Sequence, residues 1–180
     1  MPFFPTPILD LMLFEPMLRE DERGYFFEAY NAQTFREAGI EAQFVQDNQA
    51  RSTRGVLRGL HYQIEPWAQA KLVRVTEGEV LDVAVDIRPN SPTYGQSYSV
   101  LLSAANKRQL FVPRGFAHGY VVLSETAEFF YKCDNFYSKA HEGGIRWDDP
   151  TLSINWQMPP QALLLSERDA ALPLFGQHRA

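Results

Sequence analysis

Short strand-like runs dominate this chain, and some of them carry polar side chains that a sheet interior tolerates poorly. The run Gly55–Gln63 places Arg58 and His61 among apolar residues, the run Val112–His118 ends on a second histidine, and Tyr131 lies in a further apolar run. Such side chains are costly inside a sheet unless they find partners. Their recurrence on predicted strands of one chain indicates a polar pocket inside a barrel.

The runs are short and rich in β-branched and aromatic residues, and turn signals separate many of them. Strands are predicted over residues 26–30, 43–48, 55–63, 71–77, 79–87, 97–102, 109–112, 119–124, 127–133 and 152–156. Helices are expected over Asn31–Ala38, ended by Gly39, and near Ser166–Ala171, before Pro173. Strands this short and frequent predict an all-β sandwich or barrel with a few short helices.

A β-hairpin is predicted across Gly78, with Lys71–Val75 as its first strand and Glu79–Ile87 as its second. In the second strand Asp82 and Asp86 share one side with small apolar residues, and the other side is entirely apolar. One face of this strand is therefore expected to be apolar and the other mixed.

Length and charge exclude several classes of protein. A chain of 180 residues is most simply one domain, spanning residues 1–180, and its net charge of −5 argues against a nucleic-acid partner. The single cysteine, Cys133, fits a reducing compartment. No apolar stretch is long enough to span a bilayer, and no basic residue precedes Arg19, so a signal peptide is not indicated. We expect a cytoplasmic protein without a membrane partner.

Basic residues gather in one part of this acidic chain. Between Arg51 and Arg74 the only acid is Glu65, whereas the bases are Arg51, Arg54, Arg58, Lys71 and Arg74. Such a cluster can attract an anionic ligand. It can equally be the solvated edge of a sheet, and the charge pattern alone leaves both interpretations open.

Pro113, Gly115 and His118 have a spacing similar to the second motif of the cupin barrels. In metal-binding cupins the partner motif supplies two further histidines and a glutamate. Here the corresponding stretch is His61-Tyr-Gln63, so the second histidine is missing. Because stable sites need three or four ligands, no metal is expected.

His61 is a candidate general base, because a neutral imidazole accepts a proton near pH 7. A lone buried histidine is more often a satisfied core residue, so this role needs a carboxylate partner to orient the ring. Asp82, Asp86 and Asp169 are all possible partners from the sequence.

Tyr131 and Lys71 each have two interpretations. Tyr131 is either a core aromatic residue with its hydroxyl at the rim or a proton donor facing a histidine across a pocket. Lys71 is either solvated or, at a barrel mouth, a cation that stabilises an oxyanion.

A set of longer stretches spans nearly the whole chain. They are Asp21–Glu28, Gln46–Asn48, Gly55–Gln63, Lys71–Val75, Asp82–Arg88, Ser91–Gly95, Val112–His118, Tyr131-Lys132, Glu142–Pro150 and Leu165–Asp169. In this order they resemble the dTDP-4-dehydrorhamnose 3,5-epimerase family of cupin-type sugar-nucleotide enzymes. The resemblance implies a jelly-roll homodimer, without a cofactor, that acts on a dTDP-linked 4-keto-6-deoxyhexose.

The resemblance also implies a role for each matching residue. His61 would be the base with Asp169 as its carboxylate, Tyr131 the acid on the opposite ring face, and Lys71 the cation beside the enolate oxygen. Tyr137 would stack on thymine. The other implied substrate-binding residues are Arg23, Phe26, Glu28, Gln46, Asn48, Arg58, His118, Glu142 and Arg168.

Three departures from the family pattern leave the stereochemical outcome open. A serine is missing from Gln46–Ala50, Ala70 precedes the lysine where a glycine is usual, and Trp156 is followed by Gln-Met-Pro rather than by proline. Inversion of carbons 3 and 5 is the main prediction, and a single-position epimerase is the alternative. A metal-dependent cupin enzyme and a non-catalytic sugar-nucleotide binder are the other classes considered.

The N-terminal segment is expected in a dimer interface. The first eighteen residues carry no basic group and many large apolar ones. A segment this apolar is unsuited to solvent. It either packs on its own barrel or crosses to the other subunit, where the family resemblance has Arg23 or Phe26 reach the neighbouring site.

Overall fold

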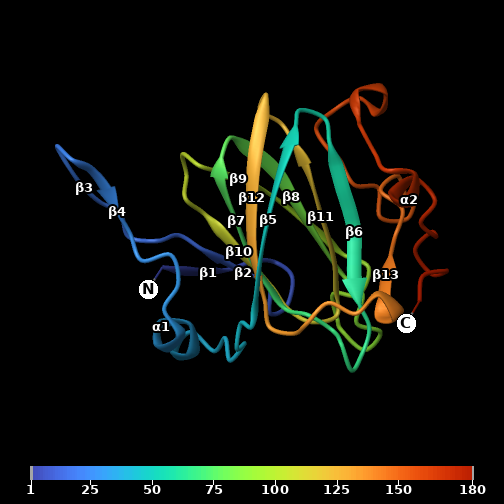
Figure 1. The fold of residues 1–180 in the computed structure, drawn as a ribbon. Helices are drawn as coiled ribbons and strands as arrows, with labels where there is room; N and C mark the ends of the chain where they lie inside the picture. Colours follow the sequence, from blue (N-terminus) through green and yellow to red (C-terminus); the bar gives the residue numbers. More distant parts are fainter. Residues whose placement is uncertain (1, 180) are drawn as a thin grey trace.

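The computed structural model describes residues 2–179 and confirms the predicted all-β, cupin-like jelly roll (Figure 1). Two sheets face each other. The six-stranded sheet has the order β1 (Phe3–Pro5), β2 (Met12–Phe14), β10 (Gln109–Val112), β7 (Lys71–Glu77), β12 (Thr126–Cys133) and β5 (Gln46–Thr53). The five-stranded sheet has the order β13 (Glu142–Gly144), β6 (Leu57–Gln63), β11 (Phe116–Val122), β8 (Glu79–Asp86) and β9 (Ser97–Ser103).

The remaining elements are short. A separate hairpin joins β3 (Arg19–Asp21) to β4 (Gly24–Phe26). The predicted helices are present as α1 (Ala32–Glu37) and α2 (Glu167–Ala170), and single 3-10 turns occur at Lys139–His141 and Pro160–Ala162. Asn31 begins α1 by accepting hydrogen bonds from the backbone of Gln33 and Thr34, as an N-cap does. No helix in residues 2–179 is long and apolar enough to cross a membrane.

The predicted hairpin across Gly78 is wrong. β7 pairs with β10 and β12, whereas β8 pairs with β11 and β9, so Gly78 carries the chain from one sheet to the other. Gly78 has a φ of +73°, and a Cβ there would stand 2.0 Å from the carbonyl oxygen of Thr126. A glycine is therefore required, but for a sheet-to-sheet crossing rather than for a two-stranded turn.

Strand β8 is buried on both of its faces. Val80 and Ala84 point into the core between the sheets, together with Phe129 of β12. Leu81 and Val83 point the other way, where the segment after β13 covers the outer face of the five-stranded sheet. That covering segment contributes apolar residues including Ile145, Leu152, Trp156 and Leu163.

Two predicted strands are absent. Residues 152–156 lie in the covering segment and pair with no strand. Leu152 and Trp156 are nevertheless buried, so the apolar pattern of this stretch reflects burial rather than a strand. Of residues 26–30, only Phe26 is in a strand, at the end of β4. The predicted strand at 43–48 begins later and extends further, as β5. Strand-forming residues become a strand only where a neighbouring strand pairs with them, and residues 27–30 and 152–156 have no such neighbour in this chain.

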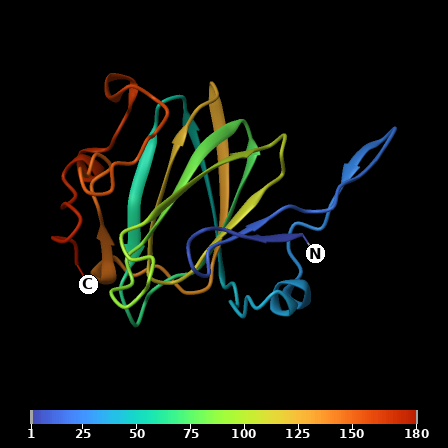
Figure 2. The ribbon, with the colours of Figure 1, turned by 180° about the vertical axis from the view of Figure 1, so that it is seen from behind.

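The N-terminal segment divides into two parts. Through Phe14 it packs on its own barrel, where β2 pairs with β10 and Ile8 and Leu11 are buried. Beyond that point the β3–β4 hairpin projects away from both sheets (Figure 2). Its Tyr25 and Phe26 are exposed, and Phe26 is 68% exposed.

At the end of β8, Asp86 is fully buried and bound by polar partners. Its carboxylate accepts hydrogen bonds from the side chains of Arg88, Ser91 and Thr93 at 2.6 to 2.9 Å. Burial raises the pKa of Asp86, but these bonds outweigh it and lower the pKa from 3.8 to about 2. Asp86 is therefore a structural residue and not the partner of His61.

Replacing Asp86 with asparagine is expected to lower the free energy of unfolding by about 2 kcal/mol at pH 7. Because the folded pKa lies below the unfolded one, the carboxylate stabilises the fold above about pH 4, and this contribution is lost as the pH falls towards 2. Urea unfolding at pH 7 and pH 3 measures it. The matched control is Asp148→Asn, which breaks an exposed pair with Arg146 and should cost less than about 0.5 kcal/mol. An equal loss in both variants would contradict the assignment.

Candidate active site

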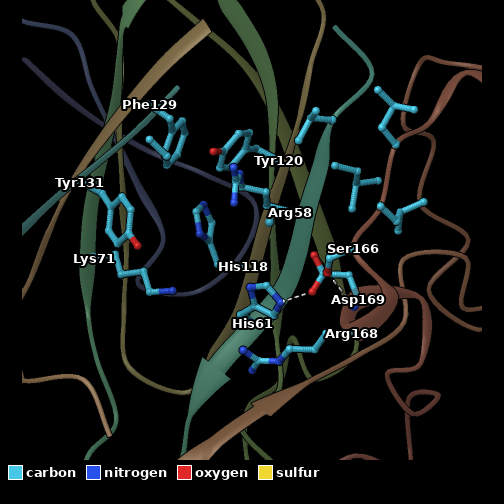
Figure 3. Close-up of a pocket in the computed structure, with 16 residues that line it drawn as sticks. Arg58, His61, Lys71, His118, Tyr120, Phe129, Tyr131, Ser166, Arg168 and Asp169 are labelled. Atoms are coloured by element: carbon cyan, nitrogen blue, oxygen red, sulfur yellow. Dashed lines mark hydrogen bonds and ion pairs between the residues drawn. The ribbon is translucent and has the colours of Figure 1, made fainter. Parts of the chain in front are cut away.

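A cavity of about 500 Å³ opens between the two sheets, and we call it the main cavity (Figure 3). The five-stranded sheet contributes Arg58 and His61 from β6 and His118 from β11. The six-stranded sheet contributes Lys71 from β7 and Tyr131 from β12. Polar residues that the sequence placed on separate strands thus line one pocket, as expected.

His61 is paired with a carboxylate from the covering segment. Its Nε2 lies 2.7 Å from Oδ1 of Asp169, which is carried by α2 and is 5% exposed. Burial raises the pKa of Asp169, but the hydrogen bond and charge of His61 outweigh it and keep the pKa below its ordinary value. Ser166, the N-cap of α2, accepts the backbone N–H of Asp169. An ionised, fixed carboxylate orients the imidazole.

The second histidine of the cavity, His118, is paired with a different carboxylate. Nε2 of His118 lies 3.0 and 2.9 Å from the two oxygens of Asp82, which is fully buried on β8. His118 and His61 are direct partners in the pairing of β11 with β6. Each of them already shares Nε2 with a carboxylate. Within residues 2–179 there is no cluster of three or more side chains suited to hold a metal ion.

Tyr131 and Lys71 form the wall opposite His61 (Figure 3). The Nζ of Lys71 is 5.9 Å from the centre of the Tyr131 ring. Burial raises the pKa of Tyr131 to about 12, so its hydroxyl stays protonated at neutral pH. Burial lowers the pKa of Lys71, and the nearby Cys133 and Asp82 partly offset this effect. The cavity therefore has a histidine suited to act as a base on one wall, and a protonated phenol beside a lysine on the other.

A second cavity of about 300 Å³ shares His61, Lys71 and Tyr131 with the main cavity. Its other lining residues include Gln46, Asn48, Gln63, Gln69, Tyr137 and Glu142. The Tyr137 hydroxyl donates a hydrogen bond of 2.9 Å to Glu142, and this bond raises the pKa of Tyr137. Arg168 pairs with the same carboxylate at 2.6 Å. Candidate nucleotide-binding residues therefore meet where the two cavities join.

Three predicted site residues lie elsewhere. Arg23 and Phe26 belong to the projecting hairpin, where Arg23 pairs with Asp21, and Glu28 follows this hairpin in an exposed position. None of the three lines the main or the second cavity. All other predicted site residues line one or both of these cavities.

Sequence reasoning missed several lining residues. Tyr120 lies two positions after His118 on β11, so the alternation of the strand places it on the same face, and it stacks on Phe129 with ring centres 4.0 Å apart. Among the described residues, the Tyr120 hydroxyl is buried and has no hydrogen-bond partner. Ser166 could have been found as the residue preceding a short helical pattern.

Fold and site together define an all-β enzyme with acid–base residues on two walls of an inter-sheet pocket. A family model described as dTDP-4-dehydrorhamnose 3,5-epimerase matches residues 5–177. The chain belongs to the dTDP-4-dehydrorhamnose 3,5-epimerase family, and it is an isomerase.

Individual relatives agree with this assignment. The dTDP-4-dehydrorhamnose 3,5-epimerase of Shigella flexneri is 58% identical over 165 residues, which cover 91% of this chain and 90% of the relative. The crystal structure of the enzyme of that name from Elizabethkingia anophelis has a TM-score of 0.94 and 55% identity, covering 97% of this chain and 96% of its own. An epimerase from Legionella pneumophila, solved in complex with dTDP-4-keto-L-rhamnose, has a TM-score of 0.93 and 49% identity, covering 97% and 93%.

Proposed function

We propose that the enzyme inverts carbons 3 and 5 of dTDP-4-dehydro-6-deoxy-D-glucose and so forms dTDP-4-dehydro-L-rhamnose. The observation that carries this proposal is the placement of the His61–Asp169 pair opposite Tyr131 and Lys71 across the main cavity. An inversion needs a base on one face of the sugar ring and an acid on the other. The Legionella relative with its bound dTDP-4-keto-L-rhamnose supports the choice of product.

The chemistry uses the 4-keto group of the substrate as its electron sink. His61 takes a proton from the carbon beside the carbonyl, and the electron pair of that C–H bond moves to the keto oxygen to form an enolate. Lys71 stabilises the negative oxygen, and Tyr131 returns a proton to the opposite face of the carbon. His61 ends the step protonated and Tyr131 deprotonated, and both recover by proton exchange with water. The balance requires no cofactor.

The remaining site residues bind the rest of the substrate. Arg58 and Arg168 face the diphosphate, because guanidinium cations are suited to phosphate oxygens. His118 lines the same cavity beside the sugar. Tyr137 stacks on thymine. Gln46, Asn48 and Glu142 line the second cavity at the nucleotide end. Gln46 links two of these residues: its side-chain Oε1 accepts the backbone N–H of Tyr137 at 3.2 Å, and its Nε2 donates to Oδ1 of Asn48 at 3.2 Å.

Proton NMR in heavy water tests the reaction directly. dTDP-4-keto-6-deoxyglucose is incubated with enzyme, and deuterium uptake and configuration are followed at carbons 3 and 5. Exchange and inversion at both carbons is the expected result. Exchange at one carbon alone would establish the alternative, a single-position epimerase, and exchange at neither would refute the proposal.

The position of the projecting hairpin supports a homodimer. The β3–β4 hairpin exposes Tyr25 and Phe26 and holds Arg23 away from both cavities of its own chain. An apolar arm of this kind is suited to a protein surface. It would place Arg23, Phe26 and Glu28 at the site of a second subunit. The cytoplasm stays the predicted location.

Mixed dimers are expected to show this exchange. A chain with Arg23→Ala and a chain with His61→Ala are each inactive alone. In their hybrid one site collects both defects and the other neither, so activity should return to about half per site. The matched control pairs His61→Ala with Tyr131→Phe, two residues of one chain's own cavity, and should not recover. Absence of recovery in verified Arg23/His61 hybrids would mean that each chain builds its own site.

A further inference from the structure

The candidate thymine-stacking residue is itself poorly buried. Tyr137 is 54% exposed and lies in the loop between β12 and the 3-10 turn at Lys139–His141. An exposed aromatic ring on a free loop would lose conformational entropy each time a ligand ordered it. The position of Tyr137 must therefore come from what holds the backbone around it.

A single buried side chain holds the backbone on both sides of Tyr137. Gln63, the last residue of β6, is 6% exposed. Its Nε2 donates to the carbonyl oxygen of Phe136 at 3.1 Å, and its Oε1 accepts the N–H of Ser138 at 2.6 Å. The second N–H of the amide is used as well, since Nε2 also donates to the carbonyl oxygen of Trp67 at 2.6 Å.

This arrangement needs an amide. Only a side chain with both donors and an acceptor can bind a carbonyl and an N–H of the same loop at once. An apolar residue of similar size would leave these backbone groups without that partner, and a carboxylate would keep only the acceptor. Two further contacts fix Tyr137 itself, because its N–H donates to Gln46 and its hydroxyl to Glu142.

Gln63 also connects this loop to the catalytic strand. It lies two residues after His61 on β6, so both side chains point to the same face, and both line the second cavity. Glu142, which receives the Tyr137 hydroxyl, is the direct partner of Gln63 in the pairing of β13 with β6. One short strand, β6, thus carries both the proposed base His61 and the side chain that holds the Tyr137 loop.

We infer that Gln63 is a positioning residue for nucleotide recognition, because it fixes the backbone on both sides of Tyr137 and so keeps the ring ready to stack on the base. Gln63 acts through Tyr137 and takes no part in proton transfer. The inference rests on the proposed function, in which Tyr137 meets thymine.

A double-mutant cycle tests this role with dTDP as the probe. Calorimetric titration gives the Kd of dTDP for wild type, Gln63→Leu, Tyr137→Ala and the double variant. Gln63→Leu is expected to raise the Kd roughly tenfold, since it removes three buried hydrogen bonds. In the Tyr137→Ala background the same change should alter the Kd by less than about twofold, because coupled residues are not additive. In turnover, KM should rise while kcat stays within about threefold.

A matched control separates loop positioning from general loosening. Asn106 also holds a loop with its amide, accepting from Ser103 and Arg108 and donating to Leu101, but lines neither cavity. Asn106→Ala should leave the Kd unchanged. If Gln63→Leu does not fold, Gln63→Met replaces it, since it keeps the length of the side chain without the amide and should give a similar rise in Kd.

The outcomes distinguish the inference from the function on which it rests. Wild-type protein that does not bind dTDP would overturn the proposed function and the inference with it. Wild-type binding together with an unchanged Kd in the Gln63 variant would overturn the inference alone. An equal rise in Kd with and without the Tyr137 ring would do the same, because Gln63 would then act independently of that ring.

Discussion

The His61→Ala variant is expected to lose about 10²–10⁴-fold in kcat while keeping its fold. The imidazole faces the main cavity, and its Nε2 lies 2.7 Å from the buried carboxylate of Asp169. Alanine removes the proton acceptor but leaves the strand pairing of β6 intact. Turnover of the dTDP-4-keto sugar, followed by NMR, and thermal unfolding measure the two quantities.

His178→Ala is the matched control for this variant. His178 packs against Tyr62 and Phe175 outside the main cavity, so its loss removes a histidine without removing the base. The control should retain wild-type turnover within about twofold, as surface changes usually do. A purified His61→Ala enzyme within tenfold of wild type would show that another group takes the proton.

The Tyr131→Phe variant is expected to separate proton removal from inversion. His61 still takes the proton, so deuterium should enter at a carbon beside the keto group. Without the phenol, whose pKa of about 12 keeps it protonated, the opposite wall loses its proposed proton donor. The product of inversion should therefore fall about 10²-fold or more relative to wild type. NMR in heavy water measures exchange and configuration in the same sample.

Tyr98→Phe is the corresponding control, because Tyr98 packs on the core from β9 and lines neither cavity. It should exchange and invert like wild type. Unchanged inversion in Tyr131→Phe would assign the acid to another residue. Loss of exchange as well as inversion would mean that Tyr131 is needed already for proton removal.

Local sequence patterns predicted where the strands lie in the chain better than which strands pair with each other. The alternating runs that became β7, β8 and β12 are correctly placed in the sequence, because alternation follows from the strand itself. The pairing of β7 with β8 was wrong, since a glycine permits a crossing between sheets as readily as a tight turn. The strand predicted over residues 152–156 was wrong for a related reason. Residues of the covering segment that are buried against the sheet show the same apolar pattern as a strand.

The site shows the same division. Arg58, His61 and His118 were recognisable because polar residues on buried strands need an explanation. The partner of His61 could not be selected from the residues alone, since Asp169 stands 108 positions away and two other aspartates were equally plausible. Asp82 and Asp86 proved to be bound to His118 and Arg88. Family resemblance, not spacing, pointed to Asp169.

The carboxylate that orients the base is not built into the barrel. Asp169 is carried by the four-residue α2. Before α2, the carbonyl oxygen of Leu164 accepts the N–H of Leu57 on β6, and after it the carbonyl oxygen of Pro173 accepts the N–H of Arg146 in the covering segment. The orientation of the base is therefore set from outside the two sheets, by the covering segment that also buries apolar residues against the five-stranded sheet. Substitutions around α2 can therefore displace the Asp169 carboxylate, and with it the orientation of the imidazole, without altering the strands that carry the rest of the site.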